Sequence, residues 1–180
     1  PLPPRFSANE LFCHTLEDSL RRIDGLSEDQ ISDASEHYNN RYLNIAIDTA
    51  KLFPEVITTL KSLRQFGLLI GIATNESRRN LLRLIEELEI NTLVHQCVCQ
   101  DEVLQTKPFP DMAKRILENF GVAPKEALVV GDSILDIDMG KAAGCRTCAV
   151  TYGAHSVDHL KSHTPHWMIN NIPSVLSIVE

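Results

Sequence analysis

Short apolar runs alternate with helical stretches throughout the chain after Pro54, and this alternation restricts the fold more than any other feature. The runs are rich in β-branched residues and predict strands at Leu68–Thr74, His95–Gln100, Ala127–Gly131 and Arg146–Tyr152. The stretches between them predict helices at Glu55–Phe66, Ser77–Leu88, Asp111–Phe120 and Ile134–Ala143. Strands that alternate with helices require right-handed crossovers, so we expect a parallel sheet with helices on both faces. The apolar character of Leu68–Ala73 and Ala127–Val130 is typical of strands buried on both faces.

The first 50 residues carry helical patterns only. A capping box at Ser7-x-x-Glu10 precedes an apolar helical face, and Gly25 is a helix stop signal. A second capping box at Ser27-x-x-Gln30 opens another helix. We therefore expect an α/β protein with a helical lobe over residues 1–50 and a three-layer core over residues 51–180.

Net charge, the length of the apolar runs and the cysteine count argue against several classes of protein. The net charge is −7 and the basic residues form no cluster, which argues against binding to nucleic acid. The longest apolar runs are too short to span a bilayer. The five cysteines are an odd number, and no charged-then-apolar leader opens the chain, so we expect reduced thiols in the cytoplasm. The chain opens on Pro1 rather than Met, which suggests that a segment lies upstream.

Ligands of open parallel sheets bind beyond the carboxyl ends of the strands. Polar residues follow two of the predicted strands, and another lies in a proline-rich turn. Thr74 and Asn75 end one strand, and a hydroxyl beside free helix amides suits a phosphate oxygen, although a helix cap is the alternative. Lys107 lies in a turn stiffened by two prolines, and Asp111 can cap the next helix. A fixed ammonium can neutralise a phosphate, although a solvated surface lysine is the alternative.

Asp132 and Asp136 provide the most specific signal. Asp132 follows a strand directly, and Asp136 lies one helical turn later, so both carboxylates can face one crevice. Two carboxylates held together are costly without a cation, and hard oxygen ligands at a phosphate site favour Mg²⁺. The alternative is a helix cap followed by a first-turn acid.

In this order and spacing the three segments resemble the haloacid dehalogenase superfamily. Thr74 matches its second motif, Lys107 its third, and Asp132 with Asp136 its fourth. Val130–Gly153 is similar to the same region of phosphoglycolate phosphatases. The resemblance implies a Rossmann-like core, a small helical cap, Mg²⁺, and hydrolysis of a small phosphorylated metabolite through an aspartyl-phosphate. It also implies that Thr74, Asn75 and Lys107 bind the phosphate.

The family's first motif, an Asp-x-Asp that supplies the nucleophile, has no clear match. Asp136-x-Asp138 lies in a predicted helix, where residues two apart point to different faces. Asp48 is the alternative, but Ala50 stands where the second aspartate belongs, and the segment continues a helix. We therefore expect the nucleophile upstream, a cap that is incomplete, and a core that lacks its first strand. The 180 residues alone are then predicted to be inactive.

Other readings stay open at this level. A dehalogenase, a mutase, and a catalytically inactive form that only binds phosphate are the alternative functions. His155, His159 and His163 recur every four residues, which permits a zinc site but is more typical of a solvated helix face. The Cys97-x-Cys99 and Cys145-x-x-Cys148 pairs also permit zinc, but apolar strand positions favour small buried thiols. Arg78 and Arg79 open a helix after Thr74 and could reach a substrate.

Overall fold

The computed structural model describes residues 16–23 and 25–179. Its first part is helical, with α2 (Leu16–Arg21) and α3 (Glu28–Thr49). The predicted capping box at the start of α3 is confirmed, because Ser27 N donates to Gln30 Oε1 at 2.9 Å and Gln30 N donates to Ser27 Oγ at 3.3 Å. The capping box predicted at Ser7 lies outside the described residues.

Five strands and six further helices follow. The strands are β1 (Gly71–Thr74), β2 (Gln96–Cys99), β3 (Leu128–Gly131), β4 (Arg146–Val150) and β5 (Trp167–Ile169). The helices are α4 (Val56–Gln65), α5 (Arg78–Glu87), α6 (Asp111–Phe120), α7 (Ile134–Ala142), α8 (Val157–Ser162) and α9 (Leu176–Val179). Short 3₁₀ turns are η1 (Gln100–Glu102), η2 (Pro124–Glu126) and η3 (Ile172–Val175). The strands and helices predicted after Pro54 are all found, with ends shifted by a few residues.

The strands form two parallel sheets, with orders β1-β2 and β3-β4-β5. Thr74 stands opposite Cys99, and Gly131 stands opposite Ala149. The sequence pattern missed β5, because this strand has only three residues. α6 ends at Gly121, whose φ of 65° is a left-handed conformation that glycine adopts at little cost.

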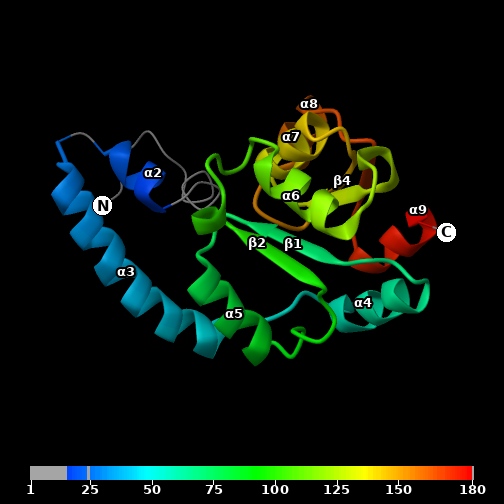
Figure 1. Ribbon diagram of the computed structural model, residues 1–180, viewed down its shortest axis with the longest axis horizontal. Coiled ribbons are helices and arrows are strands. Elements are labelled where there is room, and N and C mark those ends of the chain that lie inside the picture. The colour runs from blue at the N-terminus through cyan, green and yellow to red at the C-terminus, as the bar shows by residue number, and fades with distance from the viewer. Residues whose placement is uncertain (1–15, 24, 180) are drawn as a thin grey trace.

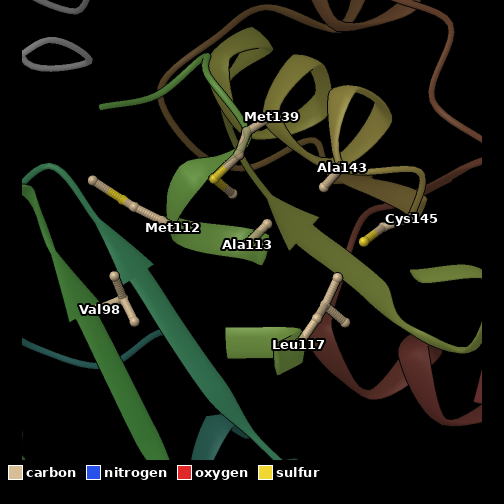
Figure 2. Close-up of a cluster of buried hydrophobic side chains, with 7 residues drawn as sticks. All are labelled: Val98, Met112, Ala113, Leu117, Met139, Ala143 and Cys145. Carbon is tan, nitrogen blue, oxygen red and sulfur yellow. The ribbon is translucent and has the colours of Figure 1, made fainter. Parts of the chain in front are cut away.

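Helices cover both faces of both sheets, giving three layers. Figure 1 shows β1 and β2 between α6 on one side and α5 on the other. Figure 2 shows Met112 and Leu117 of α6, Met139 of α7 and Val98 of β2 in one buried cluster. Ala73 of β1 and residue 129 of β3 also pack against this cluster. The two sheets therefore share one apolar layer, although β1 and β3 are not hydrogen-bonded to each other.

The expectation that the strands at 68–73 and 127–130 are buried on both faces is wrong for this chain. Leu69 is 48% exposed and Val130 is 38% exposed, whereas β4 is buried from Thr147 to Val150. The difference arises because β4 has a hydrogen-bonded neighbour on each side, while β1 and β3 each have one. Across the described ranges, no helix is both long enough and apolar enough to cross a bilayer.

Candidate active site

A buried ion pair joins two of the predicted site segments. Lys107 Nζ lies 2.6 Å from Asp136 Oδ1, and the two side chains are 14% and 11% exposed. Lys107 comes from the turn before α6, and Asp136 comes from the first turn of α7. The ammonium group that the sequence placed beside a phosphate therefore lies directly against one of the two predicted metal-site carboxylates.

The start of α7 holds Asp136 in place. Ser133 is the N-cap residue, and its Oγ accepts a hydrogen bond from Asp136 N at 3.3 Å. Asp136 Oδ2 in return accepts hydrogen bonds from Ser133 N at 3.1 Å and Ser133 Oγ at 2.9 Å. Gly131 makes room for this arrangement, since a Cβ at that position would come within 2.3 Å of the Asp136 side chain. The Ser-x-x-Asp capping box is the sequence signal that identifies the role of Ser133.

Asp136 is ionised in this setting. Burial by itself raises the pKa of its carboxyl group, but the charge and hydrogen bond of Lys107 and the hydrogen bonds from Ser133 oppose it. The net effect is a pKa below the ordinary value. Asp136 as a whole residue is only 7% exposed. A charge so far from water persists because it is paired with Lys107 and hydrogen-bonded to Ser133.

Asp132 lies at the carboxyl end of β3 and contacts the loop that follows β4. Its Oδ2 accepts a hydrogen bond from Ala154 N at 2.8 Å, and its backbone carbonyl accepts one from His155 N at 3.2 Å. A Cβ on Gly153 would come within 2.2 Å of the Asp132 side chain, so only glycine fits beside it. These loop contacts join residues far apart in the sequence, and the spacing of the motif did not predict them.

Thr74 and Asn75 lie at the carboxyl end of β1. Thr74 Oγ1 accepts a hydrogen bond from Glu76 N at 3.1 Å. Asn75 Oδ1 accepts one from Lys107 N at 3.3 Å, which ties the loop after β1 to the turn that carries Lys107. The helix cap itself is Ser77, which accepts from Asn80 N. Neither Thr74 nor Asn75 is therefore the N-cap of α5, and the purely capping interpretation of these two residues is wrong.

Other predicted residues have different surroundings. Asp111 is the first residue of α6 and not its cap, and its Oδ2 accepts a hydrogen bond from Gln105 N. Arg78 pairs with Glu102 at 3.0 Å. Asp138 faces His163, at 2.8 Å from its Nδ1, so it points away from the contacts of Asp136 as expected. Asp48 is exposed near the end of α3, in keeping with a helical position.

The predicted histidine and cysteine zinc sites form no group of three metal ligands among the described residues. The rings of His155, His159 and His163 stack edge to face, with centroids 4.9 and 5.9 Å apart for successive pairs. Among residues 16–23 and 25–179, the metal-compatible group of three is Cys99, Asp101 and Glu102.

The contacts of Cys99, Asp101 and Glu102 hold neighbouring elements together. Burial and nearby carboxylates raise the pKa of Cys99 to about 12, so the thiol stays protonated. Glu102 accepts a hydrogen bond from Cys99 N and pairs with Arg78, while Asp101 accepts from Arg78 N. The cluster therefore ties α5 to the end of β2.

Asp132 and Asp136 fit a Mg²⁺ ion as a partial ligand set. Each carboxylate oxygen can accept more than one contact, so the hydrogen bonds from Ala154 and Ser133 leave capacity for a cation. Mg²⁺ commonly takes one or two protein carboxylates and completes its shell with water and phosphate oxygens. Asp136 is already balanced by Lys107, so Asp132 is the carboxylate with the greater need for a cation.

Comparisons with known proteins identify the family of the chain. Residues 4–150 match the family model of haloacid dehalogenase-like hydrolases. Over 150 residues, 83% of this chain, the sequence is 32% identical to the phosphoglycolate phosphatase of Escherichia coli strain K12. The chain spans 60% of the length of that relative.

Two solved structures share the fold. A haloacid dehalogenase-like family hydrolase from Streptococcus pneumoniae superposes with a TM-score of 0.84 at 24% identity, over 100% of this chain and 83% of the other. A protein described as a predicted phosphoglycolate phosphatase from Haemophilus somnus 129pt gives 0.83 at 23% identity, over 98% and 84%. The fold is the Rossmann-like α/β fold of these proteins. With its matching family model, this chain belongs to the haloacid dehalogenase-like hydrolases.

Proposed function

We propose that this chain is the larger part of a Mg²⁺-dependent phosphatase that hydrolyses a small phosphate monoester. The observation that carries the proposal is the buried contact between Lys107 and Asp136, which brings an ammonium and an ionised carboxylate together. Asn75 links the loop after β1 to the same turn. A fixed positive group of this kind can stabilise the negative charge of a phosphate group. It does so efficiently because it is already in place and does not reorganise during the reaction.

Each site residue has a distinct part in this proposal. Thr74, Asn75 and Lys107 bind the phosphate, with Asn75 also orienting the lysine turn. Asp132 and Asp136 would hold Mg²⁺, which supplies charge neutralisation at the phosphate oxygens when bound. Asp136 has the further part of fixing Lys107, since both its oxygens are engaged by Lys107 and Ser133.

The nucleophilic aspartate comes, in this proposal, from a strand outside the 180 residues. That strand lies between β1 and β3 and completes the core over residues 51–180, while further helices complete the cap over residues 1–50. The support is that β1 and β3 pack on the same buried cluster yet share no ladder. A second supporting observation is that Val130, an apolar residue in the middle of β3, is exposed. The proposed strand beside β3 would cover it.

The cytoplasm is the compartment we propose. Burial raises the pKa of Cys148 to about 11, and Cys97, Cys99, Cys145 and Cys148 are free thiols. Free thiols persist in the reducing cytoplasm, whereas exported proteins more commonly pair them.

Hydrolysis by a longer protein that includes the upstream segment tests the function. We expect turnover of p-nitrophenyl phosphate and of phosphoglycolate, the substrate in the name of the E. coli relative, to be lost on addition of EDTA. Lys107→Ala should lower kcat by a factor of at least about 100, and Lys114→Ala, a change at an exposed lysine of α6, serves as the control. Turnover that persists in EDTA would reject the metal, and equal rates in the two variants would reject the role of Lys107.

A further inference from the structure

Three histidines form a row along α8. His155 precedes the N-cap residue, His159 lies within the helix, and His163 is its C-cap. Side chains four residues apart on a helix are neighbours on one face, which explains why successive rings stack. Leu160 is fully buried and anchors α8 in the core, and Figure 1 shows α8 beside α7. The row is therefore held in a fixed place next to α7.

Asp138 of α7 fixes the orientation of the His163 ring. Its Oδ1 lies 2.8 Å from His163 Nδ1, and the side chain of His163 is 29% exposed. A carboxylate only accepts hydrogen bonds, so in a neutral His163 the proton is on Nδ1 and the lone pair is on Nε2. Histidines that bind metal ions commonly donate their second ring nitrogen to a carboxylate in this way. His163 is therefore held in the form that binds a metal ion through Nε2.

His159 provides a second imidazole at a suitable distance. The residue is exposed, and the centroid of its ring lies 5.9 Å from that of His163, with the ring planes at 69°. Two rings bound to one zinc ion have centroids at most about 6.5 Å apart, because each metal–nitrogen bond is about 2.0–2.1 Å long. The observed separation is within this limit, so rotation of the side chains lets both rings bind one ion.

His155 fits the same ion less well. Its ring centroid is 4.9 Å from that of His159, but the residue is only 8% exposed. Its backbone N–H donates to the carbonyl of Asp132, which fixes it in the loop after β4. The accessible pair is therefore His159 with His163.

The charges around this pair favour one class of metal. Lys141 Nζ donates to the carbonyl of His163 and lies 2.5 Å from Thr164 Oγ1, so one ammonium and the Asp138 carboxylate flank His163. These two charges offset each other, and the lone pairs of the imidazoles must hold the ion. Imidazole suits Zn²⁺, Cu²⁺ and Ni²⁺, whereas Mg²⁺ prefers carboxylate, carbonyl and water oxygens.

We propose that His159 and His163 bind a Zn²⁺ ion, with Asp138 as the residue that positions His163. Water fills the remaining coordination positions, because the pair supplies only two of the four ligands that Zn²⁺ usually takes. This site is separate from Asp132 and Asp136, and it does not depend on the proposed phosphatase function.

Isothermal titration calorimetry of the tag-free 180-residue chain with Zn²⁺, in excess Mg²⁺, tests the site without an activity assay. We expect one Zn²⁺ ion to bind per chain. His159→Ala and His163→Ala should each raise the Kd at least about tenfold, since even loss of an outer partner of a ligand commonly costs that much. His37→Ala removes another exposed helical histidine, one with no histidine four residues away, and should leave the Kd unchanged.

NMR of the histidine rings tests the part of Asp138. Long-range ¹H–¹⁵N spectra of the wild type should show His163 with its proton on Nδ1, and Zn²⁺ should shift the ring signals of His159 and His163 together. Asp138→Ala should mix the two ring forms of His163 and raise the Kd for Zn²⁺ about tenfold. A wild-type His163 with its proton on Nε2 would overturn the positioning role.

The same measurements decide the site as a whole. Equal Zn²⁺ affinities in wild type, His159→Ala and His163→Ala, or no binding by the wild type, would overturn the proposal. Weakened binding in His159→Ala alone would also overturn it, because His155 would then be the second ligand. Weakened binding in His37→Ala to the same extent would show unspecific binding to exposed histidines, which again contradicts a built site.

Discussion

At the scale of single residues, the Lys107–Asp136 pair combines two tasks. In the proposed function the lysine binds a substrate anion, and in this structure it neutralises a buried carboxylate. Removing one partner of such a pair leaves an unbalanced charge in a site that water barely reaches. The pair therefore links the stability of the chain to the geometry of its site.

Lys107→Met should destabilise the chain by about 3 kcal/mol at pH 7, because Asp136 then stays buried and unpaired. Urea unfolding followed by circular dichroism measures this loss. Lys114→Met removes an exposed lysine from α6 and should change the free energy of unfolding by less than about 0.5 kcal/mol. Equal effects of the two changes would contradict the importance of the pair.

The loss should depend on pH in a defined direction. The pKa of Asp136 is lowered on folding, so its contribution to stability is present above the unfolded value, about 4, and is lost as pH falls through the folded value. In Lys107→Met burial acts without the lysine, and the pKa of Asp136 rises. The difference between wild type and variant should then shrink as pH falls, because the carboxyl becomes neutral in the variant while it is still ionised in the wild type. A difference that is constant from pH 7 to pH 3.5 would count against this account.

Asp132 should dominate Mg²⁺ binding, because Lys107 already balances Asp136. We expect weak binding by the 180 residues and tighter binding once the upstream segment is present, since two carboxylates supply only part of a coordination shell. In the longer protein Asp132→Asn should weaken Mg²⁺ at least about tenfold. Asp138→Asn, on the same helix but facing His163, is the control. Isothermal titration calorimetry gives both affinities, and equal values for wild type and Asp132→Asn would refute this assignment.

At the scale of elements, the edges of β1 and β3 are the unusual feature. Both strands are apolar enough for the centre of a sheet, but each has a hydrogen-bonded neighbour on one side only. The open edges therefore present amides and carbonyls that a further strand could pair, as edge strands commonly do. A strand seated between them would satisfy these groups on both sides.

Hydrogen exchange of the 180-residue chain should reveal these edges. Amides of β3 that do not donate to β4 should exchange on the order of 100-fold or more faster than those that do, because local opening is unnecessary for them. In the longer protein both sets should be protected. Uniform protection of β3 in the short chain would show that its edge is already paired.

At the scale of the whole molecule, the candidate site depends on contacts between distant segments. The loop after β1, the turn before α6, the start of α7 and the loop after β4 meet through Asn75, Lys107, Asp136 and Asp132. In the proposed function these segments bind phosphate and Mg²⁺, and none of them is assigned the nucleophile.

We therefore predict no meaningful hydrolysis of p-nitrophenyl phosphate by the 180 residues alone. Loss of the nucleophile in a covalent mechanism commonly lowers the rate by several orders of magnitude. A colorimetric assay with Mg²⁺, run beside the longer protein at equal concentration, measures the difference. Robust turnover by the short chain that EDTA abolishes would return Asp48 to consideration as the nucleophile.

Local signals let the sequence alone determine most elements, and they are the basis on which the site residues are proposed. α6 was predicted at its observed bounds, because Pro110 and Gly121 mark its ends, and the capping box of Ser27 set the start of α3. Capping and helical periodicity act between residues a few positions apart, so they can be read without the fold. The order of strands and helices was likewise enough to predict parallel sheets.

Only the tertiary structure decided which groups meet and which edges stay open. Lys107 and Asp136 are 29 positions apart, and neither their contact nor the one between Ala154 and Asp132 follows from a periodic pattern in the sequence. The exposure of Val130 depends on which strands pair, and its apolar side chain indicated the opposite. A polar cavity lined by Glu17, Ser35 and Arg79 likewise forms only where α2, α3 and α5 converge. Such contacts depend on how whole elements pack. The free energy of burying two distant side chains together cannot be read from the sequence around either of them.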